Sequence, residues 1–242
     1  MIFLPFYPLI FMFLIIIYTV ILIIFIVKFI LRFFISSNMS INGRILLVIA
    51  HPDDESMFFS PLLQCFHKRM KILCLSSGDF DGIGKIRKQE MLDLCKFCKI
   101  NCTVLDCFKD GAFWEIDRIV EEIKKEEEFN FKTIITFDKK GVSGHLNHIA
   151  CYEGVKKYAK IHHKESYFLL TYEKFFKYVW LSNFNIQKHY HVIKCASFLI
   201  GAKMLFHHKS QMLWFRYLYL IFSNYMFVNI YVKNIPQVNK KI

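Results

Sequence analysis

The run His51-Pro52-Asp53-Asp54-Glu55 places one imidazole and three carboxylates within five residues. It follows residues 45–50, an apolar run with the length and composition of a buried β-strand. Removing several carboxylates from water is costly unless a positive charge offsets them, and a divalent metal is the simplest such partner. Two adjacent carboxylates must point in different directions. One of them can therefore bind a metal while its neighbour faces the open coordination position.

A second polar group lies at Gly144-His145-Leu146-Asn147-His148. Its two histidines are three residues apart, so they share one face if a helix begins here. An H-x-x-H pair alone is weak evidence for a metal site, whereas a His-Pro-Asp-Asp-Glu run after an apolar strand is much more specific. Because each group follows a predicted strand, their joint occurrence indicates a metal-dependent active site.

The elements that must position these groups alternate along the chain between strands and helices. We expect strands over residues 44–50, 70–77, 103–107, 132–137 and 167–172, and helices over residues 55–69, 85–99, 115–129 and 146–163. This alternation predicts βαβ units and therefore an α/β fold, a Rossmann-like three-layer sandwich with a mostly parallel sheet. Ligands bind beyond the carboxyl ends of the strands in such sheets, so we expect the two polar groups to meet at one edge.

The last third of the chain is less regular. The pattern over residues 174–203 is too mixed to assign. Residues 212–232 are unusually aromatic, and interruptions by Arg216 and several polar residues disfavour a membrane crossing. We interpret this aromatic tail as core, with an amphipathic surface on a membrane interface as the alternative.

The N-terminal segment has a different character, since residues 2–27 contain no charged side chain. The segment is longer than the roughly 20 apolar residues that cross a bilayer, and longer than the usual h-region of a signal peptide. We therefore predict one transmembrane anchor over residues 1–35, a linker over 36–43 and a catalytic domain over 44–242. A hairpin or a peripheral segment is the alternative. Lys28 and Arg32 follow the apolar stretch, which places the catalytic domain in the cytosol by the positive-inside rule.

The net charge and the cysteine content indicate less about function than the motifs do. The formal net charge is +12, but the basic residues are scattered and form no Arg-rich arm, so we expect no nucleic-acid partner. Two explanations of this charge are left: binding to an anionic membrane face or phospholipid, and a general preference of the chain for Lys. The eight cysteines of a cytosolic domain should be reduced. Leu92, Cys95 and Cys98 share one predicted helix face, which favours core packing over a zinc or redox site.

Four blocks of this sequence resemble those of the zinc-dependent de-N-acetylases that act on N-acetylglucosamine conjugates. The blocks are LLVIAHPDDESMFF (46–59), GKIRKQE (84–90), TFD with GVSGHLNHIA (136–150) and HKSQMLWFR (208–216). The likeness spans roughly residues 44–232 and is strongest to the eukaryotic branch of the family. That branch hydrolyses the acetamide of N-acetylglucosaminyl-phosphatidylinositol (GlcNAc-PI), the second step of GPI-anchor biosynthesis. The resemblance therefore implies this reaction, a glycolipid substrate and a location in the endoplasmic reticulum membrane.

The resemblance also implies roles for particular residues. His51, Asp54 and His148 would bind zinc, or another divalent metal, and leave a fourth position open for water. Asp53 would accept a proton from that water, and His145 would help to stabilise the oxyanion. Either Asp53 or His145 would protonate the leaving amine.

Further positions receive supporting roles. Arg87 matches a position near the substrate sugar, with a solvated helix face as the alternative. Glu55 and Asp138 are expected to orient the metal ligands. Asn147 stands where bacterial relatives often carry Asp and matches the eukaryotic branch. Lys139-Lys140 is a candidate contact for an anionic head group.

Two other functions remain open. A de-N-acetylase of a soluble GlcNAc conjugate would share the motifs but would have no need of an uncharged anchor. A non-catalytic, membrane-bound binding subunit would have no need to keep both histidine–carboxylate groups. The sequence identifies no protein partner.

Overall fold

The chain divides into two compact units, Met1–Ser36 and Ser37–Ile242. The computed structural model describes residues 6–31, 35–172, 177–178 and 190–234. Helix α1, Phe6–Leu31, lies in the first unit, and nearly all of its described large apolar side chains are exposed. Among the described residues, no helix combines the length and the apolar character needed to cross a membrane. The transmembrane anchor therefore stays a prediction from the sequence.

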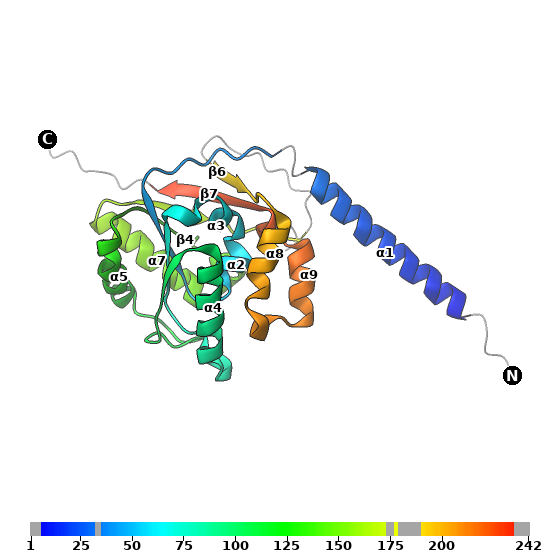
Figure 1. The fold of residues 1–242 in the computed structure, drawn as a ribbon, viewed down its shortest axis with the longest axis horizontal. Helices are drawn as coiled ribbons and strands as arrows, with labels where there is room; N and C mark the ends of the chain where they lie inside the picture. The colour runs from blue at the N-terminus through cyan, green and yellow to red at the C-terminus, as the bar shows by residue number, and fades with distance from the viewer. Residues whose placement is uncertain (1–5, 32–34, 173–176, 179–189, 235–242) are drawn as a thin grey trace. The chain divides into compact units, whose positions relative to one another are not determined.

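A seven-stranded sheet is the framework of the described part of the second unit (Figure 1). Its strand order is β3-β2-β1-β4-β5-β7-β6. The strands are β1 (Arg44–Ile49), β2 (Met70–Cys74), β3 (Asn101–Val104), β4 (Phe131–Phe137), β5 (Glu165–Leu169), β6 (Tyr190–Lys194) and β7 (Val228–Asn234). The first five pair in parallel, and β7 runs antiparallel to both β5 and β6. The expected α/β fold with a mostly parallel sheet is confirmed.

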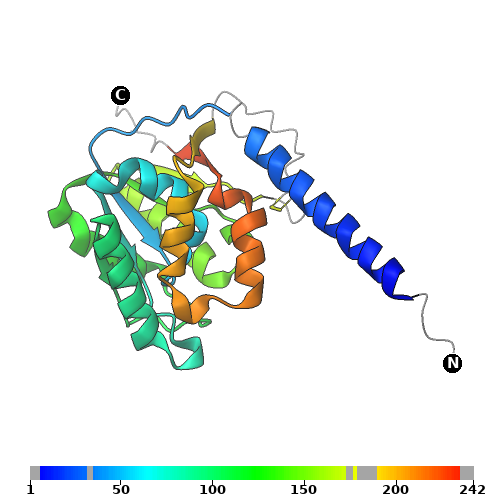
Figure 2. The same cartoon turned by 45° about the vertical axis from the view of Figure 1, so that its right-hand side comes forward.

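Helices lie on both faces of this sheet, which gives three layers. In Figures 1 and 2, α5 and α7 lie side by side on one face, whereas α4 and α8 lie on the other. The helices of the second unit are α2 (Asp54–Phe58), α3 (Ser60–Phe66), α4 (Gly84–Cys98), α5 (Ile116–Lys125), α6 (Gly141–Gly144), α7 (Leu146–Ile161), α8 (Phe198–Phe206) and α9 (Trp214–Phe222).

The topological switch point of the sheet lies between β1 and β4. From β1 the chain adds β2 and β3 on one side, and then returns to place β4 on the other side of β1. This arrangement leaves a crevice beyond the carboxyl ends of the two strands, where α/β sheets bind ligands. Residues 51–54 follow β1 and residues 138–148 follow β4. The two polar groups thus meet at one edge, as expected.

Burial explains why β1 occupies the centre. Residues 45–49 are almost completely buried, and β1 pairs in parallel with β2 on one side and with β4 on the other. A continuous apolar strand of this kind is stable only where helices cover both faces of the sheet.

One expected helix is broken. Residues 55–69 form α2, α3 and the 3-10 turn His67–Arg69 in place of a single helix. Phe59 lies between α2 and α3 with a non-helical φ of −117°. Pro61 lies in the first turn of α3, where its missing N–H has no intrahelical partner to lose. The proline therefore begins a new helix.

The C-terminal part of the chain completes the sheet. Within residues 174–203 the structure describes β6 and α8, whereas residues 173–176 and 179–189 lie outside the described residues. The aromatic tail divides between core and surface, since Tyr225 and Tyr231 are buried and Trp214 is 76% exposed. Core packing therefore explains only part of the tail.

The cysteines and the linker also have definite places. Cys95 and Cys98 are buried free thiols of α4, which confirms core packing for both, but Leu92 is 38% exposed and does not share their environment. The start of the expected linker is bound to the sheet edge. Asn38 N–H donates to the Val192 carbonyl at 3.1 Å, and its side-chain oxygen accepts from Val192 N–H at 2.7 Å.

Candidate metal centre and active site

The turn between β1 and α2 presents its polar side chains on a strained backbone. Asp53 has a φ of 122°, a conformation that residues other than glycine rarely adopt. Two buried side chains hold the turn. The Glu55 carboxylate accepts from Asp53 N–H at 3.1 Å, and Arg87 donates to the Pro52 carbonyl at 2.8 Å. Such strain persists only where surrounding contacts enforce it, and it is concentrated at active sites.

The loop after β4 is fixed by a second set of contacts. Val142 has a φ of 63°, which is unfavourable for a β-branched residue. Its N–H donates to Thr171 Oγ1 at 2.9 Å, and that hydroxyl donates to the Asp138 carboxylate. Among the described residues, the hydrogen bonds of the Asp138 side chain are with Thr171 and Lys140, so this carboxylate supports the loop. The role expected for Asp138, to orient the metal ligands, stays a prediction.

His148 points a free lone pair toward Asp54. Its Nδ1–H donates to the Gly141 carbonyl at 3.1 Å, which leaves Nε2 unprotonated in the neutral ring. This Nε2 is buried, makes no hydrogen bond among the described residues, and lies 3.2 Å from Asp54 Oδ1. Two electron-rich atoms at this distance repel each other unless a cation lies between them.

Asp54 and His51 complete the same arrangement. Asp54 Oδ2 accepts from the N–H groups of Ala50 and His51 at 3.1 and 2.8 Å, so Oδ1 is the oxygen left for a cation. His51 Nε2–H donates to Asp110 at 2.9 Å, which leaves the lone pair on Nδ1, 3.7 Å from Asp54 Oδ2. The two backbone N–H groups that donate to Oδ2 favour the ionised form of Asp54, which is the form that binds a metal.

These distances fit a tetrahedral metal. Two donor atoms, each about 2.1 Å from a tetrahedral zinc ion, lie about 3.4 Å apart. The separation from Asp54 Oδ1 to His148 Nε2, 3.2 Å, is close to that value, and His51 Nδ1 lies 3.7 Å from the other oxygen of the same carboxylate. Each histidine also donates its other ring N–H to an oxygen, the arrangement that holds metal-binding imidazoles in place. His51, Asp54 and His148 are therefore able to hold a divalent metal.

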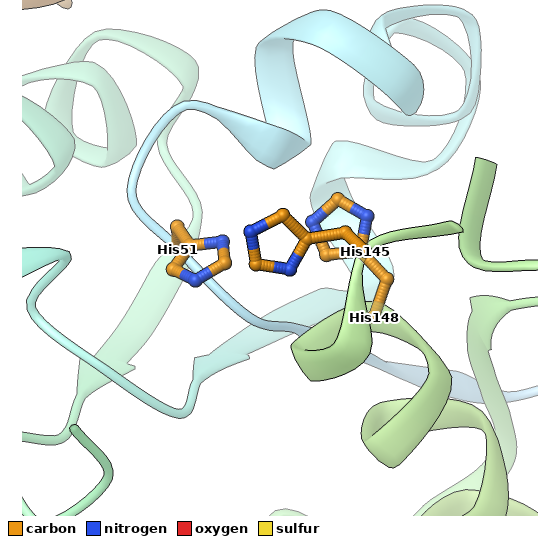
Figure 3. A group of neighbouring side chains, drawn as sticks. All are labelled: His51, His145 and His148. Atoms are coloured by element: carbon orange, nitrogen blue, oxygen red, sulfur yellow. The ribbon is translucent and has the colours of Figure 1, made fainter. Parts of the chain in front are cut away.

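His145 belongs to the same group of histidines but has a different protonation. Ligand atoms of His51, His145 and His148 all lie within 4.8 Å of one another, and Figure 3 shows the three rings grouped together. His145 Nδ1 caps α7 by accepting from Asn147 N–H at 3.3 Å, so its Nε2 carries the proton. Burial and the two neighbouring imidazoles lower the pKa of His145. It is therefore a neutral hydrogen-bond donor, which suits an oxyanion better than a metal.

Asp53 lies between two arginines. Its Oδ1 is 3.3 Å from Arg87 and its Oδ2 is 2.9 Å from Arg216. Burial raises the pKa of Asp53, although both guanidinium groups act in the opposite direction. Arg87 is only 8% exposed, so the alternative that it lies on a solvated helix face is wrong.

Three supporting residues were not singled out from the sequence. Asp110 follows β3 and fixes the tautomer of His51. Its loop is held by Asn147, whose side chain donates to the Ala112 carbonyl at 2.8 Å and accepts from Gly111 N–H at 3.0 Å. An aspartate in place of Asn147 would lack that donor. No local pattern marks Asp110, because a single Asp in a loop is common.

The other two lie in the HKSQMLWFR block. His208 Nε2 lies 2.5 Å from Glu55 Oε1, and both side chains are completely buried. This pair fixes the carboxylate that binds Asp53 N–H. Arg216 reaches Asp53 from α9. The block's resemblance to the de-N-acetylases was the available signal for both residues.

A cavity of 660 Å³ opens onto this cluster. Its polar lining includes the histidines and carboxylates described above. The rest of the lining is mainly apolar and aromatic and comes from α2 and α9. The polar residues include His51, Asp53, Asp54, Arg87, Asp110, His145 and His148, and the apolar and aromatic ones include Met57, Phe58, Trp214, Phe215, Leu218, Tyr219 and Phe222. The cavity thus offers a reactive centre beside an apolar wall.

Comparisons with known proteins agree with this geometry. Residues 46–159 match the family model PIG-L, described as GlcNAc-PI de-N-acetylase. A probable N-acetylglucosaminyl-phosphatidylinositol de-N-acetylase of Schizosaccharomyces pombe is 36% identical over 210 residues, which cover 77% of this chain and 85% of the relative. The N-acetylglucosaminyl-phosphatidylinositol de-N-acetylase of Bos taurus is 33% identical over 215 residues, covering 77% and 81%.

Among solved structures, a triple mutant of a deacetylase of teicoplanin biosynthesis has a similar fold. The TM-score is 0.60 at 11% sequence identity, over 79% of this chain and 99% of that one. A likeness at this identity concerns the fold alone.

Proposed function

The chain belongs to the PIG-L family of GlcNAc-PI de-N-acetylases, and we propose that it hydrolyses the acetamide of N-acetylglucosaminyl-phosphatidylinositol. The products are glucosaminyl-phosphatidylinositol and acetate, so the reaction is the de-N-acetylation step of GPI-anchor biosynthesis. The observation that carries the proposal is the arrangement of His51, Asp54 and His148 beside Asp53 in a cavity large enough for a sugar.

Zinc is the proposed metal, held by His51 Nδ1, Asp54 Oδ1 and His148 Nε2. Such a metal supplies Lewis acidity toward a water molecule and the acetamide carbonyl. The two-histidine, one-carboxylate set is the usual donor set of catalytic zinc. Elemental analysis of the purified protein tests the metal's identity. One zinc per wild-type chain and a much lower content in His148→Ala are expected, whereas a different resident metal would overturn the choice of zinc.

The chain's own residues supply the proton transfers. The Asp53 carboxylate accepts a proton from the attacking water, and it then delivers that proton to the amine nitrogen as the C–N bond breaks. His145 Nε2–H donates to the oxygen that becomes negative when the carbonyl carbon is attacked. Arg87 and Arg216 hold both oxygens of Asp53 in place during these transfers.

Acetate release from GlcNAc-PI tests this function. Membranes containing the wild-type protein should release acetate, and chelator or His148→Ala should abolish the release. Loss of the general base in Asp53→Asn should lower the rate by about 100-fold or more. Asp106→Asn is the matched control, because Asp106 is an exposed acid that pairs with Lys88. Equal rates for wild type and Asp53→Asn would refute the mechanism. Turnover of a soluble GlcNAc conjugate without turnover of the lipid would favour the soluble-substrate alternative.

Membrane attachment is part of the same proposal. The uncharged residues 2–27 are proposed to anchor the protein in the endoplasmic reticulum membrane, with the catalytic domain on the cytosolic side. A lipid substrate and the exposed apolar side chains of α1 support this placement. Protease treatment of sealed microsomes should digest the C-terminal domain, and alkaline carbonate should leave the protein in the membrane pellet. A protected C-terminal domain would refute the cytosolic orientation.

A further inference from the structure

Besides Arg87, two basic side chains among the described residues line the active-site cavity. Lys177 and Arg216 both line the cavity. The backbone of Lys177 is fixed by a hydrogen bond from Asn224 N–H to its carbonyl, 2.9 Å long. Its ammonium group lies over aromatic rings, 5.8 Å from the centroid of Phe58 and 5.9 Å from that of Tyr225. Lys177 is thus held at the cavity wall.

The positive charge of Lys177 has no acidic partner in the part of the chain that the structure describes. Burial lowers the pKa of Lys177, and the nearby charge of Arg216 lowers it further. Among the described residues, no carboxylate forms an ion pair with Lys177, whereas Arg216 shares the single carboxylate of Asp53 with Arg87. The Nε of Arg216 is also buried without a hydrogen-bond partner among these residues. Half-buried cations side by side are unfavourable unless an anion joins them.

Lys177 and the reactive centre share a neighbour, the ring of Phe58. Phe58 contacts both, since its ring centroid is 5.8 Å from the Lys177 ammonium and 5.8 Å from the His148 ring centroid. The Phe58 ring therefore has the Lys177 ammonium group and the His148 ring as neighbours. In N-acetylglucosaminyl-phosphatidylinositol, one inositol ring separates the acetamido sugar from the phosphodiester. Lys177 lines the same cavity as the metal-binding cluster, so one bound molecule can reach both.

We propose that Lys177, together with Arg216, binds the phosphodiester of the inositol phospholipid and so selects a lipid-linked sugar. The proposal rests on the proposed function and adds the residues that recognise the anionic part of the substrate. Lys139 and Lys140, the earlier candidates for this contact, are exposed and are not among the residues that line the cavity. The charge of the Lys177 side chain is the determinant, so arginine should replace it and methionine should not.

The kinetic test compares two substrates that differ only in the phosphate-linked lipid. The full protein in detergent is given GlcNAc-PI or uncharged N-acetylglucosaminyl-inositol, and the ratio of the two kcat/KM values is measured. Loss of a charge-assisted contact should lower this ratio by about 10- to 100-fold in Lys177→Met. Lys177→Arg should retain most of the ratio, and Lys139→Met is the exposed control that should leave it unchanged. An unchanged ratio in Lys177→Met would overturn the proposal.

A binding test separates this proposal from the proposed function. Calorimetry with glycerophosphoinositol, a soluble phosphodiester, needs no turnover. The wild type should bind it at least about tenfold more tightly than Lys177→Met. Equal binding by both would overturn the subsite. Tighter binding of inorganic phosphate than of the phosphodiester would assign the site to free phosphate and overturn the lipid-headgroup assignment. Failure of the wild type to release acetate from either sugar substrate would refute the proposed function, while the binding result would still decide the subsite.

Discussion

Replacement of Asp110 by asparagine tests the geometry of the metal centre most directly. Asp110 Oδ1 accepts from His51 Nε2–H at 2.9 Å, and both side chains are at most 10% exposed. This hydrogen bond keeps the lone pair of His51 on Nδ1, the atom that faces Asp54. The amide of asparagine presents a donor as well as an acceptor, so it permits the other tautomer, in which Nδ1 carries the proton and does not bind a metal.

The size of the effect follows from this contact. A buried hydrogen bond to a charged group contributes about 1.5–3 kcal/mol, which corresponds to a factor of about 10 to 150 in affinity. Loss of a group that orients a metal-binding histidine costs about 10- to 100-fold in affinity in other metal sites. We therefore expect zinc affinity to fall by about 10- to 100-fold in Asp110→Asn.

Competition for zinc between the protein and a chromophoric chelator measures this affinity without substrate. Asp106→Asn is the control, because Asp106 lies in the same loop region but is exposed and pairs with Lys88. Its zinc affinity should equal that of the wild type. Circular dichroism shows whether each variant is folded. A folded Asp110→Asn with wild-type zinc affinity would refute the assignment of His51 Nδ1 as the metal-binding atom.

Two further predictions concern stability. Burial lowers the pKa of His208, but Glu55 raises it above 6.5 overall. The ion pair of His208 with Glu55 therefore stabilises the folded state fully below pH 6.5, and this stabilisation is lost as the pH rises through the folded pKa of His208. Burial likewise raises the pKa of Glu55, but His208 lowers it below 4.5 overall, so its stabilisation is present above pH 4.5 and is lost on acidification. The difference in unfolding free energy between wild type and His208→Gln, measured in urea, should be largest between pH 4.5 and 6.5; a difference independent of pH would contradict the pairing. In Gly154→Ala the new Cβ would lie 2.4 Å from Ile119 Cγ2, so the variant should lose about 1–3 kcal/mol of stability despite the higher helix propensity of alanine. The double variant Gly154→Ala/Ile119→Ala should lose less unfolding free energy than the sum of the losses in the two single variants. Strict additivity in thermal or urea unfolding would show that the two side chains do not clash.

Local patterns were sufficient for the framework of the fold. The apolar run at residues 45–50 and the alternation of strands with helices predicted a parallel sheet with the two polar groups at one edge. The break at Phe59 was missed because the apolar spacing of residues 55–69 continues through it, although Pro61 marks a helix start. The antiparallel edge formed by β6 and β7 was also missed, because the register of β7 against β5 depends on contacts between distant segments.

The sequence by itself determined which residue types are available for chemistry, since His51, Asp53, Asp54, His145 and His148 lie in two short motifs at strand ends. Only the tertiary structure decided which nitrogen of each histidine is free. That choice depends on Asp110 and the Gly141 carbonyl, and on the cap that His145 forms at the start of α7.

The charges around Asp53 are likewise a property of the tertiary structure. Arg216 is 163 residues away in sequence, and Lys177 reaches the same cavity from a segment without a recognisable pattern. Contacts between residues far apart in the sequence leave no periodic pattern in it, because each partner is set by the fold rather than by its neighbours in the chain. The motifs therefore predicted the reactive centre, whereas Lys177 and Arg216, the residues proposed to select the substrate, could be identified only from the tertiary structure.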